Sequence, residues 1–210
     1  MSITKKNAEI QAENIVRRVL EEKNYLSKVL EGILAKEDSV RYPNAIALEI
    51  LSKENPKIIY PEWNFFIELL KSKNAYHKSI AISTISNLAI IDEKNRFEDI
   101  FRDFFKLIDD TSVIVSRKLA IYAGKIAIAK VSLKSKITDV LLSIDDTQHS
   151  PSRKDLIKGD IIESFSEYFE DIKDKKIIIE FVKKQLDSSS PSTVKKAKEF
   201  LLKWDKNFNY

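Results

Sequence analysis

Basic side chains recur at nearly regular intervals along this 210-residue sequence. Arg41, Lys78, Arg117, Arg153 and Lys195 are separated by 37, 39, 36 and 42 residues, and a second basic residue follows each of the last three. These second basic residues are Lys118, Lys154 and Lys196. Arginine and lysine at equivalent positions of successive structural units can neutralise phosphates without reading nucleic-acid bases. The chemistry that the spacing suggests is therefore electrostatic binding.

Residues that would support catalysis or metal binding are scarce. The sequence has no cysteine and only two histidines, His77 and His149, which are far apart and which we interpret as ordinary polar surface residues. Its three glycines are isolated, so there is no glycine-rich phosphate loop. Adjacent acids such as Asp109-Asp110 are typical of helix caps. The sequence therefore predicts no catalytic residue, no metal site and no cofactor.

Composition and charge limit the class of protein. Hydrophobic residues make up 43% and charged residues 32% of the chain, which is enough for a core and a polar surface. The 36 basic and 32 acidic residues leave a net charge of +4, so the composition permits nucleic-acid binding without requiring it. The first residues lack the apolar core of a signal peptide, and the apolar run from Ile80 to Ile91 is too short to span a bilayer. We therefore expect a cytoplasmic protein without membrane contact.

The residues around Arg117 predict a long, well-covered helix from 113 to 129. Small and apolar side chains recur there at the helical intervals of three and four residues, and they are Leu119, Ala120, Ala123, Ile126 and Ala127. Asp110 and Thr111 are expected to cap its first turn. The alanines, with Gly124, leave one face nearly flat, so a second helix can approach closely. We therefore expect Ala123 to be tightly packed, and Lys130, near the polar end, to tolerate substitution.

The rest of the chain alternates helices with short polar turns. Residues 1–23 predict an amphipathic helix that caps the N-terminus, residues 24–205 predict five helical hairpins, and residues 206–210 form a tail. The intervals between the basic residues give a period near 40, which is typical of proteins built from paired-helix repeats. Because no long linker or low-complexity tract interrupts the pattern, we expect one domain over residues 1–210.

Three segments resemble the HEAT-repeat family. Asp110 followed by Val115, Arg117 and Ala120 is similar to its pattern, as is Asp38-Ser-Val40-Arg41 with Ala45 and Ala47, and Pro191-Ser-Thr-Val194-Lys195-Lys-Ala197 is a looser copy. The resemblance covers residues 25 to 204. It implies an all-α fold, namely a right-handed α-α superhelix of about five HEAT-like hairpins with an N-terminal capping helix. It also implies that an aspartate in the turn and the arginine early in the second helix bridge neighbouring repeats.

Two interpretations of function remain open. The favoured hypothesis is a non-enzymatic scaffold or adaptor that binds a protein partner through its concave inner-helix surface or its terminal face. The alternative is a nucleic-acid-binding HEAT-like protein that resembles the bacterial alkyl-DNA glycosylases, which hold duplex DNA in a curved groove. The candidate residues for binding a partner or phosphates are Lys78, Arg117, Lys118, Tyr122, Lys125, Arg153, Lys154, Lys195 and Lys196.

The C-terminal residues are apolar for the last unit of a repeat protein. Phe200, Leu201, Trp204, Phe208 and Tyr210 have no following repeat to cover them. Large exposed apolar patches are uncommon on monomers, so either the tail folds back over the last hairpin or the end face pairs with another chain. We therefore expect a monomer, or a weak homodimer that forms through the C-terminal repeat.

Overall fold

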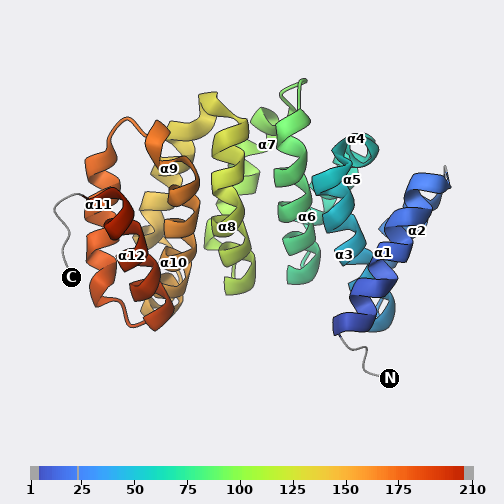
Figure 1. The fold of residues 1–210 in the computed structure, drawn as a ribbon, viewed down its shortest axis with the longest axis horizontal. Coiled ribbons are helices and arrows are strands. Elements are labelled where there is room, and N and C mark those ends of the chain that lie inside the picture. The colour runs from blue at the N-terminus through green and yellow to red at the C-terminus, as the bar shows by residue number, and fades with distance from the viewer. Residues whose placement is uncertain (1–4, 23, 206–210) are drawn as a thin grey trace. The chain divides into compact units, whose positions relative to one another are not determined.

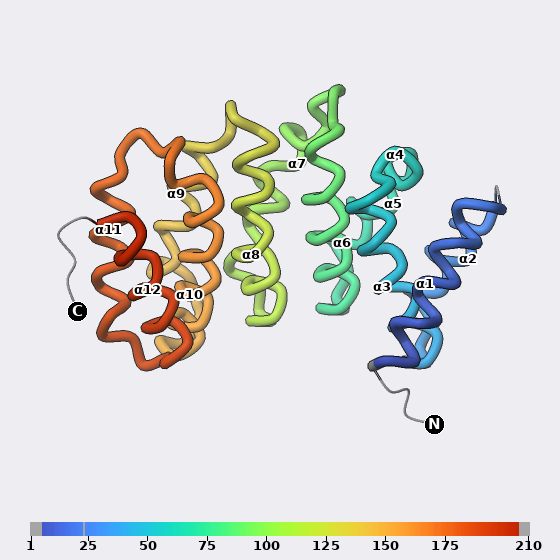
Figure 2. Tube along the Cα trace, in the orientation of Figure 1, coloured from blue at the N-terminus to red at the C-terminus, as the bar shows by residue number. Residues whose placement is uncertain are grey.

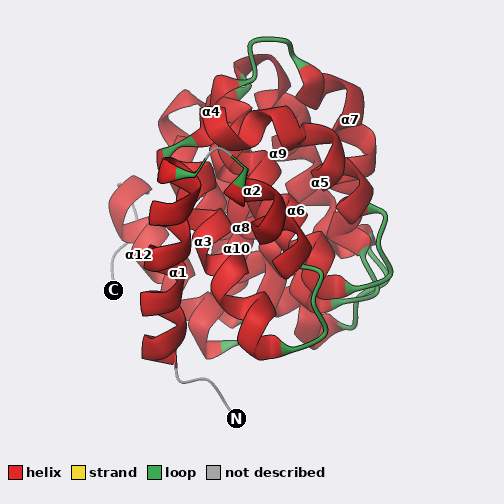
Figure 3. Cartoon of the chain, turned by 90° about the vertical axis from the view of Figure 1, so that its right-hand side faces the viewer, coloured by secondary structure: helices red, strands yellow, loops and turns green. Residues whose placement is uncertain are grey.

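The computed structural model describes residues 5–22 and 24–205, and every regular element in these ranges is a helix (Figures 1 and 3). The all-α prediction is therefore confirmed. By its internal contacts the chain divides into two compact units, Met1–Glu93 and Lys94–Tyr210. The organisation of the whole chain as one domain stays a prediction, and each unit is described by itself below.

The first unit consists of six helices within its described residues. Two polar contacts join its parts. Asn87 donates to the Ser52 hydroxyl at 2.8 Å in the interior, and Tyr60 donates to Asp92 at 2.6 Å in a partly buried contact. Trp63 is fully buried in its core. The helices are α1 (Lys5–Glu21), α2 (Tyr25–Gly32), α3 (Asp38–Glu54), the single turn α4 (Pro56–Ile59), α5 (Trp63–Leu70) and α6 (Ala75–Leu88). The predicted N-terminal helix is α1, and Lys23 at its expected end lies outside the described residues.

The second unit places three long helices in one row, with α10 packed between α8 and α12 (Figure 2). The shorter helices that precede them, α7, α9 and α11, each end in a 3-10 turn whose last residue is an aspartate, namely Asp109, Asp146 or Asp187. The helices are α7 (Arg96–Phe105), α8 (Val113–Ala129), α9 (Lys134–Leu142), α10 (Pro151–Tyr168), α11 (Lys175–Lys183) and α12 (Pro191–Trp204). The prediction of one continuous helix over 113–129 is confirmed.

Two details at the ends of α8 differ from the sequence prediction. The residue at the N-cap is Ser112, and Asp110 instead accepts a hydrogen bond from the Ser112 backbone N–H at 2.9 Å. Lys130 is not at a tolerant polar end, because it is only 6% exposed and its ammonium group donates to Asn95 at 3.2 Å and lies 3.5 Å from Glu98. The structure therefore contradicts the premise on which Lys130 was expected to tolerate substitution, namely an exposed polar end of the helix.

The flat face of α8 admits α10 as predicted. Ala120, Ala123, Gly124 and Ala127 are buried, and the Ser164 hydroxyl of α10 reaches the backbone of α8. That hydroxyl donates to the Ala120 carbonyl at 2.5 Å and accepts from the Gly124 N–H at 2.8 Å. Ala120 and Gly124 are four residues apart, so the carbonyl of one and the N–H of the other belong to the same turn of α8. The Ser164 hydroxyl therefore contacts both of these backbone groups. This contact requires close approach of the two backbones.

Replacing Gly124 by alanine should destabilise the protein, although alanine normally stabilises a helix by ~1 kcal/mol relative to glycine. A Cβ atom there would lie 2.7 Å from the backbone carbonyl oxygen of Ser164, which cannot move without shifting α10. We expect a loss of ~1–3 kcal/mol, the usual cost of overpacking. Urea denaturation would measure it.

Gly32→Ala is the matched control. The added Cβ atom would meet the side-chain amide of Asn44, which can rotate away, so any change should stay below ~1 kcal/mol. Equal losses in Gly124→Ala and Gly32→Ala would show that the approach of α10 to α8 does not impose the constraint.

Candidate interaction surface

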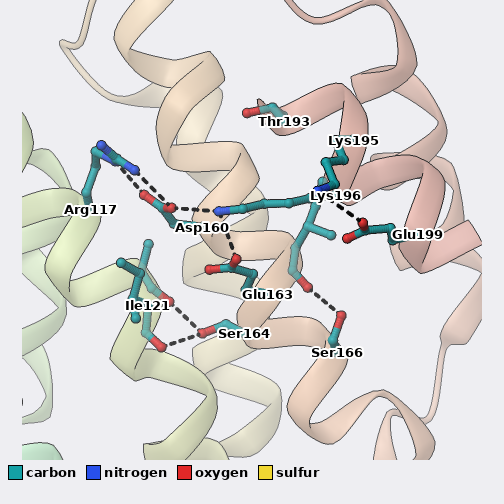
Figure 4. Close-up of polar contacts among 12 residues, drawn as sticks. Arg117, Ile121, Asp160, Glu163, Ser164, Ser166, Thr193, Lys195, Lys196 and Glu199 are labelled. Atoms are coloured by element: carbon teal, nitrogen blue, oxygen red, sulfur yellow. Dashed lines mark hydrogen bonds and ion pairs between the residues drawn. The ribbon is translucent and has the colours of Figure 1, made fainter. Parts of the chain in front are cut away.

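A buried carboxylate connects the three long helices of the second unit. Asp160 of α10 accepts from Arg117 Nε at 2.6 Å and from Arg117 Nη2 at 3.2 Å, both on α8. It also accepts from Lys196 Nζ of α12 at 3.1 Å, and Lys196 lies 3.0 Å from Glu163 (Figure 4). The four side chains form a cluster with two positive and two negative charges, which we call the Asp160 cluster.

The burial of these groups indicates that the cluster is structural. The Asp160 side chain is 1% exposed, whereas those of Arg117 and Lys196 are 41% and 20% exposed. The two cations therefore cover the carboxylate from opposite sides while keeping part of their own surface in water. The hydrogen bond to Asp160 is the main cause that raises the pKa of Arg117. A carboxylate at such depth is tolerated because both cations pair with it.

The structure places the other predicted binding residues apart from this cluster. Lys154 donates to the backbone carbonyl of Asp145 at 2.6 Å, and Lys195 lies 3.8 Å from Glu199 on an exposed face of α12. Arg153 is exposed near the start of α10, and Lys78 is half-buried on α6 in the first unit. Among the nine candidates, Arg117 and Lys196 have Asp160 as a common partner.

The bridging expected from the family resemblance takes a different form. Arg117 does pair across helices, but with Asp160 inside α10 and not with an aspartate of a turn. Asp109, in the turn before α8, instead accepts a hydrogen bond from the backbone N–H of Gln148 at 2.7 Å. Gln148 lies in the corresponding connection before α10. In the first unit Arg41 pairs with Asp38 of its own helix. The Asp160 cluster was not anticipated, because nothing in the sequence marks Asp160 as a partner of residues 43 positions before and 36 after it.

His149 is not a surface residue as the sequence suggested. It is 7% exposed, and its Nε2 atom lies 3.2 Å from the carbonyl of Ile108 and 2.9 Å from the hydroxyl of Ser116. The ring thus connects the turn before α10 with the turn before α8 and with the first turn of α8. His77 of the first unit is half-buried beside Ser72, and burial is the main cause that lowers its pKa.

An exposed row of isoleucines runs along α8. Ile114, Ile121 and Ile128 are 66%, 38% and 48% exposed and are spaced seven residues apart. Residues seven apart in a helix lie nearly above one another, with a drift of about 20° per heptad. We call these three residues the α8 isoleucine row. Arg117 lies on the α10 side of the row, because it reaches Asp160.

The remaining α8 candidates flank the isoleucine row. Lys118 and Lys125 each follow an isoleucine of the row by four residues, so they lie one turn further along the same face. The Lys118 ammonium group lies 4.7 Å from the ring centroid of Tyr122. Lys125 lies close enough to Glu167 of α10 to oppose the rise in the Glu167 pKa that burial causes.

Comparisons with known proteins add the fold alone. No family model matches the chain, and no curated protein does. The chain is similar to an engineered protein whose crystal structure was determined by the Northeast Structural Genomics Consortium, with 16% sequence identity and a TM-score of 0.50 over 94% of this chain and 88% of that chain. At this identity the likeness carries no information about function.

The described residues contain neither a metal site nor a membrane-spanning helix, and they form one cleft of note. No group of three or more histidine, aspartate or glutamate side chains there could hold a metal ion. None of the described helices has both the length and the apolar character to cross a membrane. A cleft of about 460 Å³ lies between α9 and α11, where Val131 and Ile177 line it together with charged residues, including the pair Lys134–Asp171.

The C-terminal aromatic residues that the structure describes are packed within the second unit. Phe200 is 3% exposed, Leu201 is fully buried, and the Trp204 ring lies 5.0 Å from that of Phe169. Phe169, which follows α10, therefore helps to cover the aromatic residues of α12. Phe208 and Tyr210, on which the fold-back prediction depends, lie outside the described residues.

Replacing Asp160 by alanine should destabilise the protein because it removes the acceptor that Arg117 and Lys196 share. Hydrogen bonds to charged groups contribute ~1.5–3 kcal/mol, and both cations can regain water, so we expect a loss of ~2 kcal/mol. Thermal and urea denaturation would measure it. Glu199→Ala is the matched control, because its pair with Lys195 is 63% and 77% exposed and should contribute less than ~1 kcal/mol. A loss for Asp160→Ala no larger than that of the control would contradict the structural role of the cluster.

Proposed function

We propose that this chain is a non-enzymatic, HEAT-like helical-repeat scaffold that binds a protein partner through the exposed face of α8. The observation that carries the proposal is the α8 isoleucine row. Isoleucine is a weaker helix former than lysine, glutamate or alanine, so an exposed position gains no helical stability from it. Three such residues on one line of a helix whose Val115, Leu119 and Ile126 are fully buried support a surface that a partner covers.

The repeat architecture is supported by the recurring local structure of the second unit. The 3-10 turns after α7, α9 and α11 share the same position and the same terminal aspartate. Each turn leads into a long helix, and α8, α10 and α12 pack in chain order. Repeated helix pairs that contact their neighbours present extended surfaces, which this class of protein uses for binding.

The isoleucine row favours a protein partner over a nucleic acid. Fully burying an isoleucine side chain contributes ~1.5–3 kcal/mol, so a partner that covers the row gains apolar contact that a phosphate backbone cannot supply. The basic residues give the nucleic-acid alternative less support, although α8, α10 and α12 together carry ten basic and five acidic residues. Arg117 and Lys196 already pair with Asp160, and Glu163 adds a second carboxylate. A phosphate placed there would meet both carboxylates.

The terminal face is the weaker of the two binding surfaces that the sequence suggested. The exposed side of α12 presents the Lys195–Glu199 pair, and its large apolar residues Phe200 and Leu201 are buried. Leu202 is the single large apolar residue that is exposed among the described residues of α12. Such isolated residues are normal on a protein surface.

Capture from native lysate by the immobilised chain should depend on the isoleucine row. We expect a protein that remains bound after nuclease treatment and that is lost with Ile114→Glu/Ile128→Glu. The matched control is Val131→Glu/Leu202→Glu, two apolar residues that are 70% and 53% exposed elsewhere in the second unit. Quantitative mass spectrometry would measure retention. Capture that both double variants lose equally, or that nuclease abolishes, would refute a protein-binding role of the row.

Mobility-shift assays with a short DNA duplex test the alternative directly. Because the cations of the Asp160 cluster are neutralised by carboxylates, we expect no shift even at low salt. A shift that weakens steeply as the salt concentration rises would favour phosphate binding and the nucleic-acid alternative.

A further inference from the structure

We draw no further inference here: the strongest candidate, the cleft between α9 and α11, carries no proposal because ammonium groups of Lys134 and Lys173 line it together with carboxylates such as Asp139, so that nothing in the structure shows the charge of a ligand that it would take.

Discussion

A buried carboxylate without partners would be too costly to persist in this fold, and the second unit is arranged around that constraint. Asp160 lies in the middle of α10, and its charge is compensated only when Arg117 of α8 and Lys196 of α12 both reach it. The pairing fixes more than distance. It also sets how far each outer helix of the row slides along α10, because a shift by one turn would carry either cation out of reach.

Apolar packing alone would not fix that register. The contact of Ser164 with Ala120 and Gly124 adds a second fixed point on the α8 side, since the hydroxyl must reach one particular turn of the backbone. Small residues allow the approach, and directional hydrogen bonds select one position from those that the flat face allows. Stability therefore comes largely from the apolar core, whereas the relative position of α8 and α10 comes from a few polar atoms.

Local sequence predicted the elements of this chain better than its polar contacts. The helix over Val113–Ala129 followed from residues three and four apart, a signal contained within the helix itself. The role of Arg117 could not be predicted in the same way, because it depends on a residue 43 positions away. The burial of Lys130 and His149 could not be predicted from the sequence for the same reason. Each is polar by composition, but partners on other segments, Asn95 for one and Ile108 for the other, make its burial tolerable.

The polar contacts of the second unit span similar distances along the chain. Arg117 to Asp160, Ser164 to Ala120, Asp109 to Gln148 and Asp155 to Ser189 join residues 34 to 44 positions apart, which is one helix pair to the next. Contacts of such uniform and moderate range allow folding to begin in one pair and spread to its neighbours. Among the described helices of the unit, α10 has a long-helix partner on both sides, whereas α12 packs against α10 alone of the long helices. Amide hydrogens should accordingly exchange slowest in α10, and the unit should open from its C-terminal end before its centre separates.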